Sequence, residues 1–395
     1  MTTRWRSTGW MRLACAQISP ATASSTAWRW KAEFMDDELH ESWARFLGSL
    51  QRASQRVDEL TVDRDASERA EGHRFLTRVL SAMTDFYMEQ DADQPSLVRI
   101  MTPTRKFYGD NPDTLYDRVA LRPDRSYRVR GRRGNDLYMA FCVYGLQGTR
   151  NAILANVSDR DLSFDTGGSF ELTLSAQPPV GGGNWLELAP NARSMVVRQY
   201  FIDHTRIEPA RLQIEMLGEP TPANLPAPAQ VARRLRATGE AVERTLAITA
   251  EATAAWMARP NELSMDSDAA GLSGLFPTPD NRYVGGWYRL EENQALVITG
   301  QPPVARYWSA QLWSRWLESR EYRWQQVSLN HSQIQLESDG SFRIVIAHRP
   351  PNSTGSRNWL DASGHREGCV VLRWLQAEHT PPPPIFRVVD VEALR

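Results

Sequence analysis

Three residues of the sequence have the chemistry that general acid–base catalysis requires. Asp113 and Tyr116 lie three residues apart in the segment DTLY, where a carboxylate and a phenol could exchange protons with a bound substrate. His331 is the third candidate catalytic residue, because a histidine in a cleft between domains would titrate near neutral pH. The alternative for Asp113 and Tyr116 is structural: the aspartate caps a turn and the tyrosine belongs to the core.

Tryptophan and arginine are concentrated in one segment, RYWSAQLWSRWLESREYRW, at residues 306–324. Aromatic and guanidinium groups together form flat surfaces on which rings, sugars or partner proteins stack. The alternative is a tryptophan-rich core with arginine and glutamate on its surface. The candidate ligand-binding residues are Trp308, Trp313, Trp316 and Arg315.

The histidines offer little for a metal site. His365 and Glu367, in the segment GHREG, are the nearest pair, and two ligands without a third do not indicate a bound metal. The sequence has no HExxH motif, no GxSxG elbow and no phosphate-binding loop. We therefore expect no metal and no cofactor.

A duplication within the chain explains where these residues lie. The tripeptide NWL occurs twice, and other matches follow in the same order with slowly increasing spacing. Tyr116 and Tyr283 are 167 residues apart, whereas Arg198 and Arg373 are 175 apart. Ordered matches of this kind indicate a duplicated domain with small loop insertions, and not a short-period repeat.

The duplicated segments have the pattern of β-strands. In GSFELTLSA, Phe170, Leu172 and Leu174 alternate with polar residues, which is the two-residue period of a half-buried strand. GSFRIVIAH repeats the pattern with Phe342 and Ile344. Short strands separated by glycine and proline turns predict a sandwich or jelly roll in each copy.

Amphipathic helices are expected at 31–60, at 66–90 and at about 228–258, because apolar residues recur there with helical spacing. The predicted fold is therefore mainly β with helical additions, an α+β protein. Its expected parts are a disordered leader (1–30), a helical segment (31–94), a first β domain (95–217), a proline-rich linker with a helix (218–262) and a second β domain (263–395).

Residues that both copies share are expected to be structural. The asparagines should bond local backbone, and the tryptophans that follow them should fill the sandwiches. The mid-strand arginines should pair with a carboxylate, with Asp113 and Asp280 as the candidates. These shared positions are Asn184, Trp185, Asn358, Trp359, Arg198 and Arg373.

Composition excludes several classes of protein. The 46 basic and 47 acidic residues are balanced, which argues against a nucleic-acid partner. No apolar run approaches the length of a membrane span, and three widely spaced cysteines predict no disulfide framework. We expect a cytoplasmic protein; export is the alternative, although Arg12 interrupts the apolar stretch that a signal peptide needs.

The second copy resembles a bacterial family called domain of unknown function 1214. The first copy contains the DTLY segment, and this segment makes the first copy look like the partner module, domain of unknown function 1254. The resemblance covers roughly residues 95–390, with two departures. The family usually has proline after NWL, where this chain has Glu187 and Asp361, and the family's NP..RY pattern is replaced by LNHSQI at 329–334. The matching residues are Asp280, Arg282, Tyr283, Tyr307, Trp308, Ser309, Asp339, Gly340, Ser341, Asn358, Trp359, Leu360 and Arg373.

Family members accompany the breakdown of steroids and other hydrophobic compounds, so the resemblance implies a small hydrophobic partner. The first functional hypothesis is binding or turnover of such a molecule in a cleft of the tandem β domains. Two alternatives use the tryptophan- and arginine-rich segment instead. One is a non-catalytic module for carbohydrate or another ligand, and the other is a surface for homo-oligomer formation.

Overall fold

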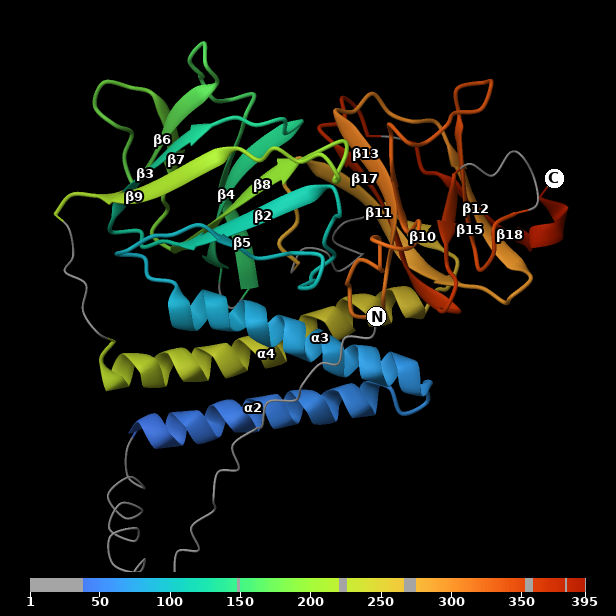
Figure 1. Cartoon of the computed structure of the whole chain (residues 1–395), viewed down its shortest axis with the longest axis horizontal. Coiled ribbons are helices and arrows are strands. Elements are labelled where there is room, and N and C mark those ends of the chain that lie inside the picture. The colour runs from blue at the N-terminus through green and yellow to red at the C-terminus, as the bar shows by residue number, and fades with distance from the viewer. Residues whose placement is uncertain are drawn as a thin grey trace, which may run out of the picture.

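The computed structural model describes residues 38–147, 150–219, 226–265, 275–351, 358–380 and 382–394. Within these residues the chain is an α+β protein, in which two β halves lie side by side above the helices (Figure 1). The predicted fold class is confirmed. The leader expected at 1–30 lies outside the described residues.

The first β half consists of a five-stranded and a four-stranded sheet packed as a sandwich. The strand orders are β1-β2-β8-β4-β5 and β7-β6-β3-β9. Neighbouring strands are antiparallel, except for the parallel pair β6 and β7. The strands are β1 Val98–Arg99, β2 Thr114–Ala120, β3 Ser126–Arg132, β4 Tyr138–Gln147, β5 Arg150–Ser158, β6 Ser169–Ser175, β7 Asn184–Glu187, β8 Ala192–Tyr200 and β9 Arg211–Leu217.

The second half repeats this arrangement strand for strand, which confirms the duplication. Its sheets have the orders β10-β11-β17-β13-β14 and β16-β15-β12-β18, and β15 and β16 are again parallel. A 3-10 turn, η3 Val391–Ala393, follows the last strand. The strands are β10 Leu263–Ser264, β11 Asn281–Arg289, β12 Gln294–Gly300, β13 Tyr307–Trp313, β14 Ser328–Asn330, β15 Phe342–Ala347, β16 Trp359–Asp361, β17 Glu367–Leu375 and β18 Ile385–Asp390.

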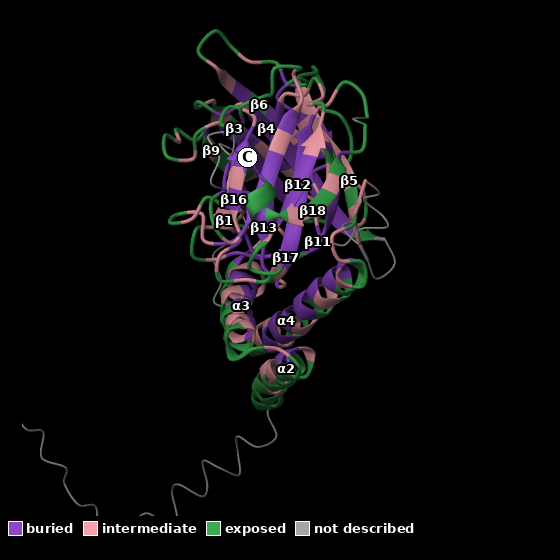
Figure 2. Cartoon of the chain, turned by 90° about the vertical axis from the view of Figure 1, so that its right-hand side faces the viewer, coloured by how far each residue is buried: buried purple, intermediate pink, exposed green. Residues whose placement is uncertain are grey.

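Alternate side chains of both sheets form each sandwich core. Phe170, Leu172 and Leu174 of β6 are buried in the first core, as their two-residue period predicts. Phe342 and Ile344 of β15 occupy the same places in the second core. Buried segments run along the strands, whereas the loops at the sandwich ends are exposed (Figure 2).

The helices form two layers beneath the sheets. α3 (Ala66–Thr84), continued by a π-helical turn η1 (Asp85–Glu89), and α4 (Pro228–Met257) lie next to the sheets, and α2 (Glu38–Leu60) lies outside them (Figures 1 and 2). No helix among the described residues is long and apolar enough to cross a membrane.

The helices begin where local chemistry favours them. Asp65 caps α3 by accepting a hydrogen bond from the Glu68 N–H at 2.8 Å, and Pro228 occupies the first turn of α4. Trp316 reaches down from the second β half into the helical layer, where it stacks on Phe75 of α3. This contact joins the helices to the second sandwich.

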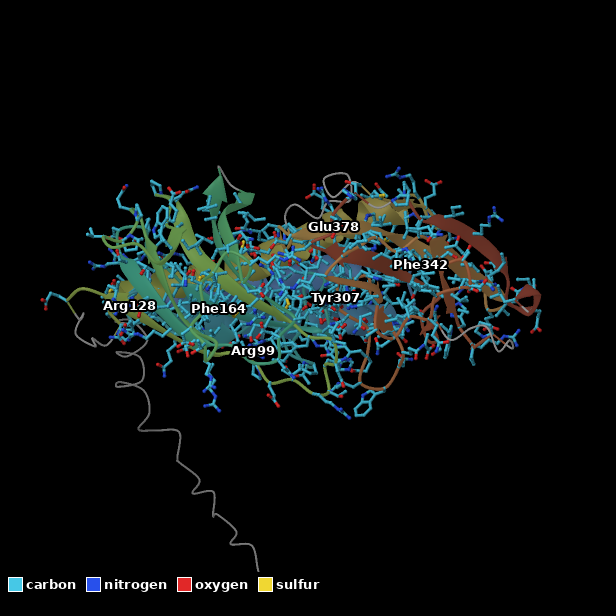
Figure 3. All side chains as sticks on the ribbon, turned by 90° about the horizontal axis from the view of Figure 1, so that it is seen from above. Arg99, Arg128, Phe164, Tyr307, Phe342 and Glu378 are labelled. Carbon is cyan, nitrogen blue, oxygen red and sulfur yellow. The ribbon has the colours of Figure 1, made fainter. Side chains whose placement is uncertain are left out.

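The two β halves exchange equivalent hydrogen bonds where they meet. Asp113 of the first half accepts hydrogen bonds from the Tyr307 hydroxyl at 2.7 Å and from Asn330 Nδ2 at 2.8 Å, both in the second half. Reciprocally, Asp280 accepts a hydrogen bond from the hydroxyl of Tyr138 at 2.6 Å. Tyr307 lies between the halves in Figure 3. The halves therefore meet as two subunits of a twofold dimer would.

The repeated asparagines bond local backbone in both halves, as expected. Asn184 Nδ2 donates to carbonyl oxygens of its own half at 2.9 and 3.0 Å, and Asn358 Nδ2 does so at 2.7 and 3.0 Å. The tryptophans that follow do not fill the sandwiches. Trp185 and Trp359 are half-buried, because they belong to the short edge strands β7 and β16 and each indole N–H donates to a carbonyl of the neighbouring strand.

Candidate functional site

A cavity of about 500 Å³ lies between the five-stranded sheet of the first half and the helical layer. Strands β2, β4 and β8 form one wall, and η1 and α4 contribute the other. The loop that leads into the second half, residues 275–278, closes part of it. Its size and mainly apolar lining are those of small-molecule sites. The apolar and aromatic lining includes Met83, Phe86, Tyr87, Ile100, Met101, Phe107, Tyr108, Tyr116, Tyr144, Val196, Leu275 and Phe276.

In the described residues of the second half, tryptophans occupy the space at the equivalent sheet face. Trp287 and Trp313 are 1% and 2% exposed and pack with Trp256 of α4. Strand register places Ala120 and Tyr144 of the first half at the positions of these two sheet tryptophans. The cavity therefore exists where smaller side chains replace tryptophan.

Two residues of the cavity wall have a strained backbone. Tyr108 and Phe276 both line it with positive φ angles, of 52° and 53°, which cost a bulky residue about 1–3 kcal/mol. Phe276 lies seven residues before Tyr283, as Gly109 lies seven before Tyr116. The second half thus carries a strained phenylalanine where the first carries a glycine, and its ring forms part of the cavity wall.

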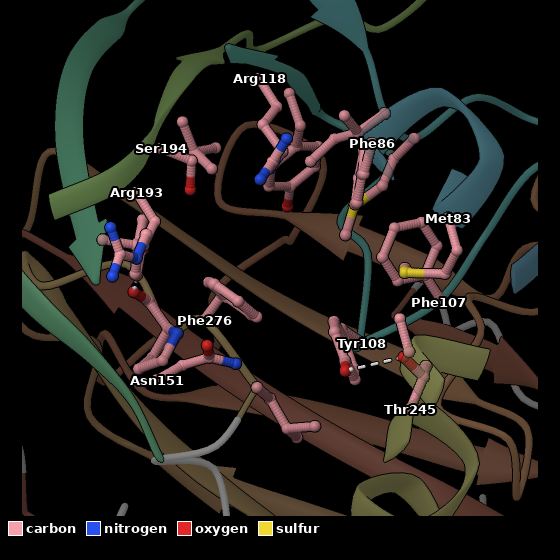
Figure 4. A pocket seen from close by; sticks show the side chains of 18 of the residues that line it. Met83, Phe86, Phe107, Tyr108, Arg118, Asn151, Arg193, Ser194, Thr245 and Phe276 are labelled. Atoms are coloured by element: carbon pink, nitrogen blue, oxygen red, sulfur yellow. Dashed lines mark hydrogen bonds between the residues drawn. The ribbon is translucent and has the colours of Figure 1, made fainter. Parts of the chain in front are cut away.

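The cavity is polar at one side and apolar at the other (Figure 4). A hydrogen bond of 3.0 Å between the hydroxyls of Tyr108 and Thr245 belongs to the apolar side. The polar side carries Arg118, Arg193, Ser194 and Asn151, and the opposite side carries Met83, Phe107, Tyr108 and Thr245.

Arg198 of β8 and Arg373 of β17 also line the cavity, at 3% and 2% exposure. They do not pair with Asp113 and Asp280, as the sequence had led us to expect, because those carboxylates point across to the opposite half. Arg198 donates to the Tyr144 hydroxyl at 2.8 Å and to a backbone carbonyl at 2.7 Å.

Both guanidinium groups keep buried nitrogens without a hydrogen-bond partner, namely Nε and Nη1 of Arg198 and Nε of Arg373. Burial raises the pKa of Tyr116 and Tyr144 well above the usual range and raises that of Tyr108 to about 12. These phenols are therefore neutral near pH 7 and supply no negative charge to balance the two guanidinium groups.

Comparison with known proteins places the chain in a family. A family described as "protein of unknown function (DUF1214)" matches residues 116–201 and 285–379. The solved structure of an uncharacterized protein from Burkholderia cenocepacia is similar over 89% of this chain and 97% of its own, with 30% identity and a TM-score of 0.82. The chain belongs to the DUF1214 family.

The other comparisons add little. The VPA0106 protein from Vibrio parahaemolyticus is 12% identical, with a TM-score of 0.46 over 80% of this chain and 98% of its own. A search of curated proteins finds no match. That the first half of this DUF1214 protein is a domain of unknown function 1254 module stays a prediction.

The structure separates the three predicted catalytic residues. Tyr116 lines the cavity, whereas Asp113 and His331 lie where the two halves meet. His331 packs edge-on against Tyr307, and its Nδ1 accepts a weak hydrogen bond from the Trp308 N–H at 3.4 Å. Burial lowers the pKa of His331. A catalytic role for these residues stays a prediction, and Tyr116 is the one that a ligand in the cavity would touch.

The expected stacking face of tryptophan and arginine is not formed, because the three candidate tryptophans are buried. Trp308, Trp313 and Trp316 are 5%, 2% and 1% exposed. Arg315 forms an ion pair with Glu68 of α3 at 2.7 Å. The tryptophan-rich core, which was the alternative, describes this segment of the DUF1214 protein, and Trp313 alone of the three lines the cavity.

The candidate metal pair is engaged in other contacts. Glu367 forms ion pairs with Arg64 and with Arg289, the latter at 2.6 Å. His365 contacts Glu71 at 2.8 Å through Nε2. In the part of the chain that the structure describes, no three His, Cys, Asp or Glu residues are grouped so that they could hold a metal ion.

Sequence motifs and periodicity do not identify most of the residues of the cavity wall. Ala120, Ser194 and Arg118 carry no motif, and no periodicity distinguishes them. A position-by-position comparison of the two copies would have found them, since Trp287, Cys369 and Gly285 stand in their places in the second half. Differences between the copies were the informative signal.

Proposed function

We propose that this protein binds a small hydrophobic molecule in the cavity between the first β half and the helices. The observation that carries the proposal is the difference between equivalent faces of the two halves. One is filled by Trp287 and Trp313, and the other is left hollow by Ala120 and Tyr144. An unfilled apolar cavity lowers stability, so an occupant that fills it would offset that loss.

The lining suits a rigid hydrophobic body such as a steroid-like ring system. Aromatic rings and the flexible thioethers of Met83 and Met101 surround the space and can adapt to the shape of a ligand. The family resemblance to proteins that accompany the breakdown of hydrophobic compounds points the same way. Binding is the function proposed, and Tyr116 is the candidate catalytic residue that lines the cavity.

Filling the cavity by mutation tests this function. Ala120→Trp gives the first half the residue that the second half carries as Trp287, and it should remove the ligand space while leaving the fold intact. The control is Ala229→Trp, the same substitution on the exposed surface of α4. Binding is measured with the neutral hydrophobic dye N-phenylnaphthylamine, whose fluorescence rises in apolar sites.

We expect saturable dye binding by wild type and by the Ala229→Trp variant, and none by Ala120→Trp at an unchanged melting temperature. Undiminished dye binding by a folded Ala120→Trp variant would place the dye elsewhere and overturn the proposal, as would a wild type that does not bind the dye. If Ala120→Trp does not fold, Tyr144→Trp, which copies Trp313, takes its place with the same expectations.

A further inference from the structure

We propose that the cavity is specific for an amphipathic organic acid, whose carboxylate lies at the side of the cavity that carries Arg118 and Arg193. This inference rests on the proposed function and adds the chemical class of the ligand. The apolar body of the acid would lie towards Met83 and Phe107 on the opposite side (Figure 4).

The charge of the lining is strongly unbalanced. Among the described residues, five arginines and one glutamate line the cavity. Positive charge with low-dielectric walls raises the local concentration of anions and favours their binding. The charged residues are Arg118, Arg193, Arg198, Arg244, Arg373 and Glu240.

The two arginines of the polar side are specific to the hollow half. Strand register places Arg118 at the position of Gly285, and Arg193 at that of Gly368. A Cβ atom at Gly285 would lie 2.9 Å from the ring of Trp256, so the filled half has no room for such a side chain. The cavity and these two guanidinium groups thus occur together in the first half, and the equivalent positions of the second half are glycines.

The Arg118 side chain is held in place by neutral neighbours, so that its positive charge stays available to a ligand. Its guanidinium lies 4.5 Å from the ring centre of Phe86 and donates to the side-chain oxygen of Gln90. Neither Arg118 nor Arg193 has a carboxylate within ion-pair distance in the described part of the chain. Burial lowers the pKa of Arg118 to about 10, so the group stays protonated near pH 7. Ser194 and Asn151 add neutral donors to the same side.

The two buried arginines of the cavity lining, Arg198 and Arg373, make an uncharged ligand less suitable. Arg198 and Arg373 are both nearly inaccessible, both face the tyrosines of the cavity, and both keep nitrogens without a partner. A buried charge without a counterion is costly, and a nearby anion reduces that cost. A carboxylate in the cavity would reduce this cost.

The experiment compares an acid with its uncharged counterpart. Decanoate and methyl decanoate share one alkyl chain, and each is titrated against bound N-phenylnaphthylamine. We expect decanoate to displace the dye at a concentration at least tenfold lower, because charge-assisted hydrogen bonds discriminate by about a factor of ten or more. Equal displacement by both compounds overturns the acid preference and leaves the cavity function intact, whereas absence of dye binding removes the cavity function itself.

Two variants assign the preference to its residues. Arg118→Gln and, separately, Arg193→Gln should each bring the displacement by decanoate close to that by methyl decanoate, with displacement by the ester unchanged. Arg130→Gln, on the exposed face of β3, is the control and should keep the tenfold preference. An undiminished preference in both cavity variants would overturn the assignment. Because Arg193 is exposed, its substitution tests the site even if Arg118→Gln fails to fold.

Discussion

Trp316→Ala tests how the second β half is joined to the helical layer. The indole is 1% exposed, stacks on Phe75 with ring centres 5.8 Å apart, and donates from Nε1 to the Glu68 carbonyl at 3.4 Å. It also packs against the backbone at Gly72, where an added Cβ would lie 2.6 Å from the ring. Truncation would leave a void between α3 and the second sandwich.

The magnitude follows from the area that the indole buries. A buried tryptophan removes about 200 Å² from water, which at about 25 cal/mol per Å² amounts to about 5 kcal/mol as an upper bound. The remaining Cβ and partial relaxation around the void reduce this, whereas lost packing contacts increase it. We expect the free energy of unfolding to fall by about 3–5 kcal/mol.

Urea unfolding followed by circular dichroism measures this change. Trp324→Ala is the matched control, because the Trp324 side chain is 78% exposed and should give a change below about 0.5 kcal/mol. Trp316→Ala should also make α2 and α3 more sensitive to limited proteolysis, since Trp316 covers part of α3. A loss below about 1 kcal/mol for Trp316→Ala, or equal losses for both variants, would refute the account of how the layers are joined.

Two further predictions concern the backbone and pH. Gly109→Ala should lower the free energy of unfolding by about 1–3 kcal/mol more than Gly340→Ala. Both glycines have positive φ, but only at Gly109 would the added Cβ lie against another side chain, 2.5 Å from the ring of Trp313. Equal losses of the two variants in urea unfolding would contradict this. The hydrogen bond to Asp113 raises the pKa of His204 above 6.5, so the pair stabilises the fold fully below that pH and less as pH rises through the folded pKa. The stability advantage of wild type over His204→Asn should therefore shrink between pH 6 and pH 8, and a constant advantage would argue against it.

Much of the architecture could be predicted because it is written in local patterns. The two-residue period at Phe170 and Phe342 identifies strands whatever surrounds them, and the helical spacing around α4 does the same for the helix. The duplication could be detected because both copies keep the same anchors, such as Asn184 and Asn358. These residues bond backbone within their own half, so their role is independent of the partner half.

The site could not be predicted in the same way, because its residues act through contacts between distant segments. The direction in which the Asp113 carboxylate points depends on Tyr307, 194 residues further along the chain. The sequence predicts that Trp313 is a stacking residue, whereas its packing against α4 in the structure makes it part of a core. The cavity is defined by side-chain volume that is missing at Ala120, and this absence becomes visible in the sequence only when Ala120 is compared with Trp287 at the equivalent position of the other copy.

The reciprocal contacts of Asp113 and Asp280 have a consequence for how such a protein can evolve. In a dimer of identical chains, every substitution occurs in both subunits, so a cavity opened in one subunit is opened in its partner as well. Covalent linkage of the two copies removes that constraint. The second copy can keep its tryptophan packing and stabilise the pair, while the first copy loses part of its packing and gains space for a ligand.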